Sequence, residues 1–177
     1  MKQKILFIPG IFNPRWYQKY WRALCTEHGF EYIELENPYY SYWRIESMEE
    51  VIEEWVEKFK EYENEELIVI CHSFGGILIN CILQRLGNYK IKKLVILASP
   101  LQMNILGMRK RKKLLKYNPD LNYDATKIIS YGGYIDLIVP CVWTRYKDEE
   151  HHTVFGEHFY FLFSKRFIRK ILKSLEE

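Results

Sequence analysis

Short apolar runs alternate with longer segments of helical spacing along almost the whole chain. The short runs are rich in β-branched residues, and several are closed by Gly, Pro or Asn, a pattern typical of buried strands. On this basis we predict six strands, at residues 5–8, 31–35, 67–70, 94–98, 127–130 and 153–155.

The longer segments are predicted to be helices, because their apolar residues recur every three or four positions. After Ser47, which opens a capping box, Trp55 and Phe59 share one face and the glutamates lie opposite. Helices are predicted at 16–28, 48–59, 74–86 and after Ser164. Strands that alternate with helices indicate a three-layer α/β sandwich: a mostly parallel sheet of about six strands with helices on both faces. The residues 1–177 fit a single domain.

One strand-to-helix junction carries a candidate nucleophile. The strand at 67–70 leads into residues 71–76 (CHSFGG), and the apolar helix follows at once. A tight turn of this kind can expose the hydroxyl of Ser73 at the positive end of the helix. Because serine is a weak nucleophile at neutral pH, it needs a histidine base oriented by a carboxylate. Ligands of parallel sheets bind at the carboxyl ends of the strands, so the partners are expected there.

Among the five histidines, His158 fits the role of base, since it follows a predicted strand and a glycine turn. His28 closes a surface helix, and His72 is expected to point away from the neighbouring serine. His151 and His152 lie in a charged stretch that we interpret as an exposed loop or helix end. A capping or surface role is the alternative for His158.

The carboxylate is predicted to be Asp136, with Asp148 as the substitute. Asp136 follows the strand at 127–130 and a turn at 131–134, which places it at a carboxyl end as well; the alternative is an ordinary turn or helix-cap aspartate. Two backbone N–H groups should stabilise the substrate oxyanion. We expect them from Phe74 and from Ile11 in the loop after the first strand, with Phe12 as an alternative to Ile11.

These motifs resemble those of the α/β-hydrolase superfamily. Residues 71–76 are similar to its nucleophile elbow, G-x-S-x-G, and the chain order Ser73, Asp136, His158 matches its order of nucleophile, acid and base. Residues 136–140 and 156–159 resemble the contexts of its acid and base, and residues 9–11 resemble its oxyanion loop. Cys71 replaces the first glycine of the elbow, and proline replaces the usual histidine of the oxyanion loop. The resemblance implies a small serine esterase or lipase-like member with a minimal cap.

The sequence therefore predicts a serine hydrolase that cleaves a carboxylic ester or thioester of a small or medium acyl substrate through an acyl-Ser73 intermediate. A catalytically idle hydrolase fold that binds a protein or ligand is the alternative. Cys71 is a rival nucleophile beside His72, but neighbours in a strand point to opposite faces, so adjacency does not make them a productive pair.

The segment at 101–126 is predicted to be a small lid. Its five cations begin at Arg109 and end at Lys113. They can mark a membrane-surface helix or a site for anionic substrates, but we favour a solvated basic helix. Five residues that follow strands or belong to this segment are expected to line the pocket: Phe12, Trp16, Tyr39, Leu101 and Met103.

Composition excludes some partners and sets the expected compartment. The net charge of +3 does not by itself indicate a nucleic-acid partner. The four cysteines are scattered without a C-x-x-C pair, no zinc-type ligand cluster is present, and we expect neither a metal nor an organic cofactor. Because Met1 leads almost directly into a strand, no signal peptide is expected, and we predict a cytoplasmic protein with reduced thiols.

Overall fold

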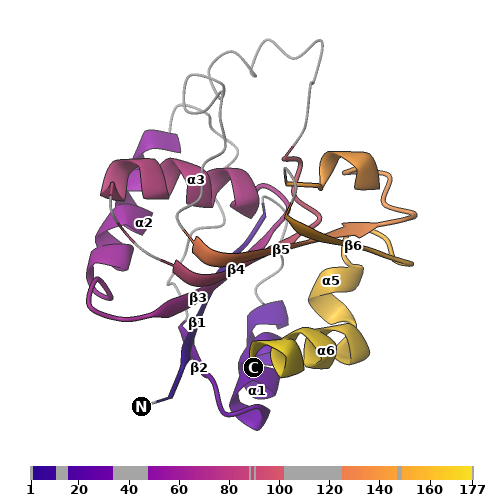
Figure 1. Cartoon of the computed structure of the whole chain (residues 1–177), viewed down its shortest axis with the longest axis horizontal. Coiled ribbons are helices and arrows are strands. Elements are labelled where there is room, and N and C mark those ends of the chain that lie inside the picture. The colour runs from indigo at the N-terminus through magenta and orange to yellow at the C-terminus, as the bar shows by residue number, and fades with distance from the viewer. Residues whose placement is uncertain are drawn as a thin grey trace.

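The computed structural model describes residues 2–10, 16–33, 48–87, 89, 91–101, 125–146 and 149–176. Within these residues, six strands form one sheet in the order β2-β1-β3-β4-β5-β6, and every neighbouring pair is parallel (Figure 1). The strands are β1 (Lys4–Ile8), β2 (Glu31–Ile33), β3 (Leu67–His72), β4 (Ile91–Leu97), β5 (Ala125–Gly133) and β6 (Glu150–Val154). The predicted α/β sandwich with a parallel sheet of about six strands is confirmed.

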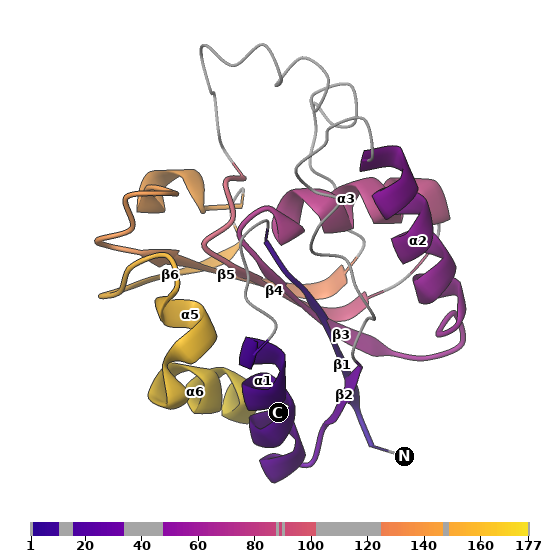
Figure 2. The same ribbon diagram turned by 180° about the vertical axis from the view of Figure 1, so that it is seen from behind.

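Helices cover both faces of the sheet (Figures 1 and 2). On one face lie α2 (Met48–Lys60) and α3 (Gly75–Leu86). On the other lie α1 (Trp16–Glu27), α5 (Tyr160–Phe163) and α6 (Lys165–Leu175). These ranges confirm the four predicted helices to within two residues at the ends that the structure describes, whereas α5 and the short 3₁₀ helix η3 (Cys141–Trp143) had no clear signal in the sequence.

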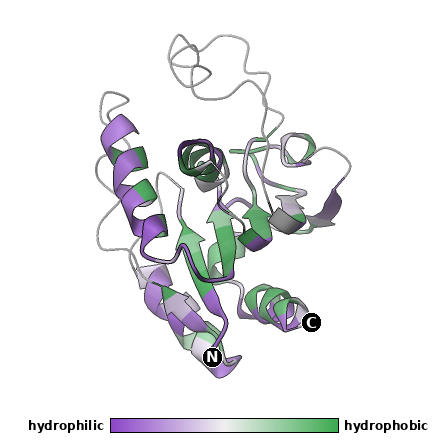
Figure 3. Ribbon diagram, turned by 60° about the vertical axis from the view of Figure 1, so that its left-hand side comes forward, coloured by the Kyte–Doolittle hydropathy of each residue, from purple (hydrophilic) through white to green (hydrophobic). Residues whose placement is uncertain are grey.

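Each face of the sheet has its own apolar core. Alternate residues of β3 serve the two sides: Val69 and Cys71 pack beneath α2 and α3, whereas Ile68 and Ile70 pack against α1 and α6. All six side chains of β3 are buried, as expected for a central parallel strand. In Figure 3 the central strands are hydrophobic over most of their length, whereas α2 alternates between hydrophobic and hydrophilic positions.

Two predicted elements near the last edge of the sheet are wrong in detail. β5 continues to Gly133, so the turn predicted at 131–134 begins only after three further strand residues. β6 spans Glu150–Val154, so His151 and His152 lie in a strand and not in an exposed loop or helix end. Because β6 is the edge strand and is largely unburied, it can contain polar residues and lacks the apolar run by which buried strands are found.

The strand order has a switch point between β1 and β3. The chain passes from β1 outward to β2, then returns past β1 to β3 and continues in the other direction. In open α/β sheets, ligands bind at such a switch point, outside the carboxyl ends of the strands. None of the helices in the described part of the chain has the length and apolarity needed to span a bilayer. The predicted lid lies outside the described residues except at its ends, and with it Arg109, Lys113 and Met103.

Candidate active site

The turn that carries Ser73 has an unusual backbone conformation. β3 ends at His72 and α3 begins at Gly75, and Ser73 between them has a φ of +52°. Residues with a Cβ rarely adopt this left-handed region, so the surrounding contacts must stabilise it. One of them is the Ser73 amide, which donates a hydrogen bond to the Leu97 carbonyl at 2.8 Å and so attaches the turn to the end of β4. A sharp turn with a strained serine is the geometry that a nucleophile elbow requires.

Glycines let the loop after β1 approach this turn. A Cβ built on Gly10 would lie 2.7 Å from the Ser73 Cβ and 3.2 Å from its Oγ. A Cβ on Gly75 would collide with the backbone carbonyl of Ile8 and lie 2.9 Å from that of Pro9. Pro9 and Gly10, the described part of the predicted oxyanion loop, therefore lie directly beside the serine turn.

We expect Gly10→Ala to lower kcat/KM for an ester substrate by at least about 10-fold, since the added methyl group displaces either Ser73 or the loop. Steady-state kinetics on the purified variant measure the effect. Gly29→Ala is the matched control, because a Cβ there meets no other atom within 4 Å, although its φ of +81° will lower stability. Unchanged kinetics in Gly10→Ala would contradict the close approach.

Cys71 stands at the first elbow position and is fully buried. Its side chain belongs to the cluster beneath α2 and α3, with Ile8, Leu78 and Ile96. Burial raises the pKa of the Cys71 thiol well above its ordinary value, so the group stays neutral. A buried neutral thiol is a poor nucleophile, which argues against the rival role of Cys71. Here it acts as a small apolar side chain.

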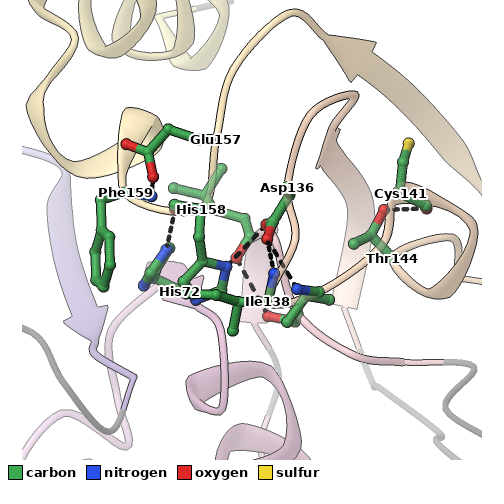
Figure 4. Close-up of polar contacts among 11 residues, drawn as sticks. His72, Asp136, Ile138, Cys141, Thr144, Glu157, His158 and Phe159 are labelled. Carbon is green, nitrogen blue, oxygen red and sulfur yellow. Dashed lines mark hydrogen bonds and ion pairs between the residues drawn. The ribbon is translucent and has the colours of Figure 1, made fainter.

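A buried hydrogen bond joins the two residues predicted to assist Ser73. Asp136 follows β5 and His158 follows β6, and His158 Nδ1 lies 2.8 Å from Asp136 Oδ2 (Figure 4). The two residues are only 5% and 4% exposed. The other carboxylate oxygen, Oδ1, accepts hydrogen bonds from the backbone amides of Ile138 and Val139, each at 2.8 Å. Both oxygens of the carboxylate are thus engaged.

These contacts set the charge of the pair. Burial alone would raise the pKa of Asp136, but the hydrogen bonds from His158 and from the Val139 and Ile138 amides outweigh it and lower the pKa. Asp136 is therefore a carboxylate at neutral pH. Since a carboxylate only accepts hydrogen bonds, Nδ1 of His158 carries the proton and Nε2 of the neutral ring is the acceptor nitrogen. This is the tautomer that a general base needs.

His72 connects this pair to the serine turn. Its Nε2 lies 2.9 Å from the backbone carbonyl oxygen of His158, and the centroids of the two imidazole rings are 4.8 Å apart (Figure 4). Because His72 directly precedes Ser73, the segment that contains His158 lies against the turn. The carboxyl ends of β3, β5 and β6 thus bring Ser73, Asp136 and His158 to one edge of the sheet. Sequence reasoning gave His72 no role, because its partner, the His158 carbonyl, lies 86 positions away in the sequence.

Burial of His72 makes stability depend on pH. Burial and the nearby His158 lower the pKa of His72 from 6.5 to about 3, and the hydrogen bond to the His158 backbone and the Asp136 charge oppose this shift. Between these values the unfolded chain binds the proton more readily, so the stability present above pH 6.5 is lost as the pH falls. We expect His72 to account for about 2 kcal/mol of lost unfolding free energy between pH 7 and pH 5. Denaturant unfolding of wild type and His72→Gln at both pH values measures it, and an equal decrease in both proteins would contradict it.

The other three histidines have partners elsewhere in the described structure. His28 Nδ1 pairs with the Glu176 carboxylate, and His152 Nε2 with that of Glu150, both at 2.7 Å. The Nδ1 atom of His151 lies 2.8 Å from the Ser130 Oγ. Among the described histidines, His158 is the one with a hydrogen bond to Asp136, and its role as the base stays a prediction.

The remaining predicted site residues fall into two groups. Ile11, Phe12, Tyr39, Met103 and Asp148 lie outside the described residues. Phe74 occupies the N-cap position of α3 with an α-helical backbone, so its amide belongs to the helix N-terminus. Leu101 packs against the apolar cluster beneath α2 and α3. Trp16 is 60% exposed and stacks on Phe163. Their roles in the oxyanion hole and pocket stay predictions.

A cavity of about 700 Å³ lies at the opposite end of the sheet, near the amino ends of β3 and β4. Its lining mixes both signs of charge, with Lys60, Glu66, Arg85 and Lys92 among its residues. It is separate from the strand ends that carry Ser73, Asp136 and His158. In the described residues, no three His, Cys, Asp or Glu side chains are grouped as a metal site.

Solved structures share this architecture, although no protein-family model matches the sequence and a search of curated proteins found no match. A hydrolase of the α/β superfamily from Xanthomonas campestris pv. campestris aligns over 98% of this chain and 99% of its own, with a TM-score of 0.69 and 14% identity. An α/β hydrolase enzyme from the metagenome of lagoon sediments at Mar Chica, Morocco, aligns over 99% and 91%, with a TM-score of 0.70 and 15% identity. The chain has the α/β-hydrolase fold. A monoacylglycerol lipase from Paleococcus ferrophilus is also similar, at a TM-score of 0.61 and 13% identity over 97% of this chain and 93% of its own.

At such identities the likeness establishes the α/β-hydrolase fold, and function has to be argued from the site. The fold places its nucleophile after a strand at a sharp turn, and its acid and base follow later strands in the order Ser, Asp or Glu, His. In this chain the turn lies after β3, and the Asp136–His158 hydrogen bond lies after β5 and β6. The recognition of the α/β-hydrolase fold from the motifs at 71–76, 136–140 and 156–159 is confirmed.

Proposed function

We propose that the protein is a serine hydrolase that cleaves a carboxylic ester or thioester of a small or medium acyl substrate. One observation carries the proposal: the buried Asp136–His158 hydrogen bond, held by His72 against a turn in which Ser73 has a φ of +52°. Burying a charged carboxylate and an imidazole has a large desolvation cost, even when both carboxylate oxygens accept hydrogen bonds. Buried pairs of this kind are therefore found most often at functional sites. General acid–base chemistry on a neighbouring hydroxyl is the use that these three groups suit.

In the proposed reaction, Ser73 Oγ attacks the carbonyl carbon while Nε2 of His158 accepts the hydroxyl proton. The C–O or C–S bond to the leaving group then breaks, and His158 returns the proton to the departing alkoxide or thiolate. Water, deprotonated by the same nitrogen, attacks the acyl-Ser73 carbonyl, and Ser73 leaves with the proton. Asp136 keeps the imidazole in the correct tautomer and stabilises the imidazolium in both steps. We assign the oxyanion to the amides of Phe74 and Ile11.

The surface near Asp136 supports an apolar substrate. Leu137, directly after Asp136, is 95% exposed, and Ile138 is also exposed. Tyr134 and Phe155, from the loops after β5 and β6, are exposed and stack on one another at 6.5 Å between ring centroids. Solvated apolar side chains beside a catalytic carboxylate favour an apolar acyl or leaving group over a charged one.

Labelling with a fluorophosphonate probe tests the proposal. The probe should modify wild type at Ser73, as mapped by peptide mass spectrometry, and should not modify Ser73→Ala. Ser99→Ala is the control, because Ser99 is a buried serine at the end of the neighbouring strand. Folded wild type that resists the probe would overturn the enzyme proposal and favour a binding module of the same fold.

We also propose a reducing compartment, the cytoplasm, as the place of action. All four cysteines are free thiols, and Cys25, Cys71 and Cys81 are buried. Burial raises the pKa of Cys25 to about 12 and that of Cys81 to about 11, so neither forms a thiolate at neutral pH.

A further inference from the structure

His72 is the last residue of β3, and its side chain is fully buried between the serine turn and the loop that contains His158. Its Nε2 is 2.9 Å from the His158 carbonyl oxygen, and the contact joins residues 86 positions apart in the sequence. Its ring also lies 6.4 Å from that of Phe159 between centroids. His72 directly precedes the proposed nucleophile, and its side chain therefore connects the end of β3 to the main chain of the proposed base (Figure 4).

The contact fixes the tautomer of His72. A backbone carbonyl only accepts hydrogen bonds, so Nε2 of His72 carries the hydrogen and donates it. The other ring nitrogen, Nδ1, is then an acceptor, and it is buried with no hydrogen-bond partner among the described residues. Burying a polar atom without a partner is unfavourable. An apolar residue of the same size would avoid that loss, which indicates that the Nε2 donor has a use of its own.

The loop that contains His158 needs such a donor. His158 lies between β6 and α5, outside both elements, and so has no strand or helix ladder to hold its backbone. Asp136 orients the His158 ring through Nδ1, but this single hydrogen bond does not stop the ring from moving when the backbone of His158 moves. The bond from His72 holds the opposite end of the residue, the carbonyl group, at the serine turn. His158 is thus held at its ring and at its main chain.

We propose that His72 is a positioning residue that holds the main chain of His158 against the Ser73 turn, so that the base stays aligned with the nucleophile. The proposal rests on the proposed serine hydrolase function. Proton transfer between Ser73 and His158 depends on their alignment, and a displacement of about 1 Å can reduce the rate by about 100-fold. The lowered pKa of His72 supports this role, because a neutral ring adds no second charge when His158 becomes an imidazolium.

Two substitutions separate the hydrogen bond from the space that the ring fills. His72→Phe keeps the ring and removes the donor, whereas His72→Gln keeps a donor near the position of Nε2 and removes the ring. On a p-nitrophenyl ester we expect kcat of His72→Phe to fall about 10- to 100-fold with KM nearly unchanged, and kcat of His72→Gln to stay within about 3-fold of wild type. His28→Gln is the control, because His28 is half-buried and its ring pairs with Glu176 and not with a residue of the proposed site.

A second measurement is independent of activity. The proton shared by His158 Nδ1 and Asp136 should give a downfield resonance in wild type and His72→Gln and a broadened or missing one in folded His72→Phe. Two outcomes would overturn the positioning role. One is a wild-type kcat and resonance in His72→Phe. The other is an equal loss in His72→Phe and His72→Gln when their melting temperatures show that both variants fold. If folded wild type neither hydrolyses the ester nor reacts with the fluorophosphonate, the proposed function fails, and the resonance still decides the role of His72.

Discussion

We expect Ser73→Ala and His158→Ala each to reduce kcat for ester hydrolysis by about 10⁴- to 10⁶-fold, and the double variant to lose no more than the worse single one. In the proposed mechanism the serine oxygen and the imidazole take part in one proton transfer. When either group is removed, the other can no longer take part in that transfer. Activity above the uncatalysed rate should remain, because backbone donors and substrate binding survive both changes. Single-turnover kinetics with p-nitrophenyl esters measure the effect.

The matched control for these variants is Ser99→Ala, which removes a buried hydroxyl from the neighbouring strand end without touching the proposed pair. Its kcat should stay within about 3-fold of wild type, because the Ser99 hydrogen bond to the Leu97 carbonyl is long, at 3.4 Å, and the Ser73 amide keeps its own 2.8 Å hydrogen bond to the same carbonyl. Losses in the two single variants that multiply in the double variant would show that the residues act independently, which contradicts a shared proton transfer.

We expect Asp136→Asn to lower kcat by about 10⁴-fold, as for the analogous substitution in the well-known protease triad. The amides of Ile138 and Val139 both donate to Oδ1, so they fix the asparagine with its oxygen in that place. The NH₂ group must then face Nδ1 of His158, where the carboxylate oxygen now lies. The ring is forced into the tautomer that carries hydrogen on Nε2, and that nitrogen can no longer accept the Ser73 proton.

Asp136→Ala provides the comparison. It removes the carboxylate without imposing the wrong tautomer, so its kcat should be equal to or higher than that of Asp136→Asn. Its stability should be lower, because the two amides lose their acceptor. An asparagine variant with wild-type kcat would contradict the assigned tautomer, and melting curves of both variants show whether the loop after β5 remains folded.

The central part of the fold was accessible from sequence because its signals are local. Continuous apolar runs identify β1, β3 and β4, and the three- and four-residue spacing identifies α2 and α6. The end of β5 was not accessible, since Gly132 and Gly133 look like a turn. The need for glycine at 132 comes from a segment later in the chain. A Cβ on Gly132 would lie 2.7 Å from the Cys141 Sγ, so close packing of η3 on the strand requires glycine there.

The candidate site was predictable to the same degree. Asp136 and His158 could be found because each follows a strand, and the carboxyl ends of parallel strands meet at one edge. The predicted start of β6 was too late because Glu150, His151 and His152 form no apolar run, yet the loop after the strand was located correctly. The role of His72 could not be read from sequence, because it depends on a carbonyl group 86 residues away.

The placement of His158 after the edge strand has a consequence for inactivation. β6 pairs with β5 on one side, and most of its residues are only partly buried or exposed, whereas β3 is buried along its whole length. Edge segments of this kind open locally at a lower free energy than the core. Amide exchange should therefore be faster in β6 than in β3, and heating should abolish hydrolysis before the sheet melts. The protein would lose its base while the turn that carries the nucleophile is still intact.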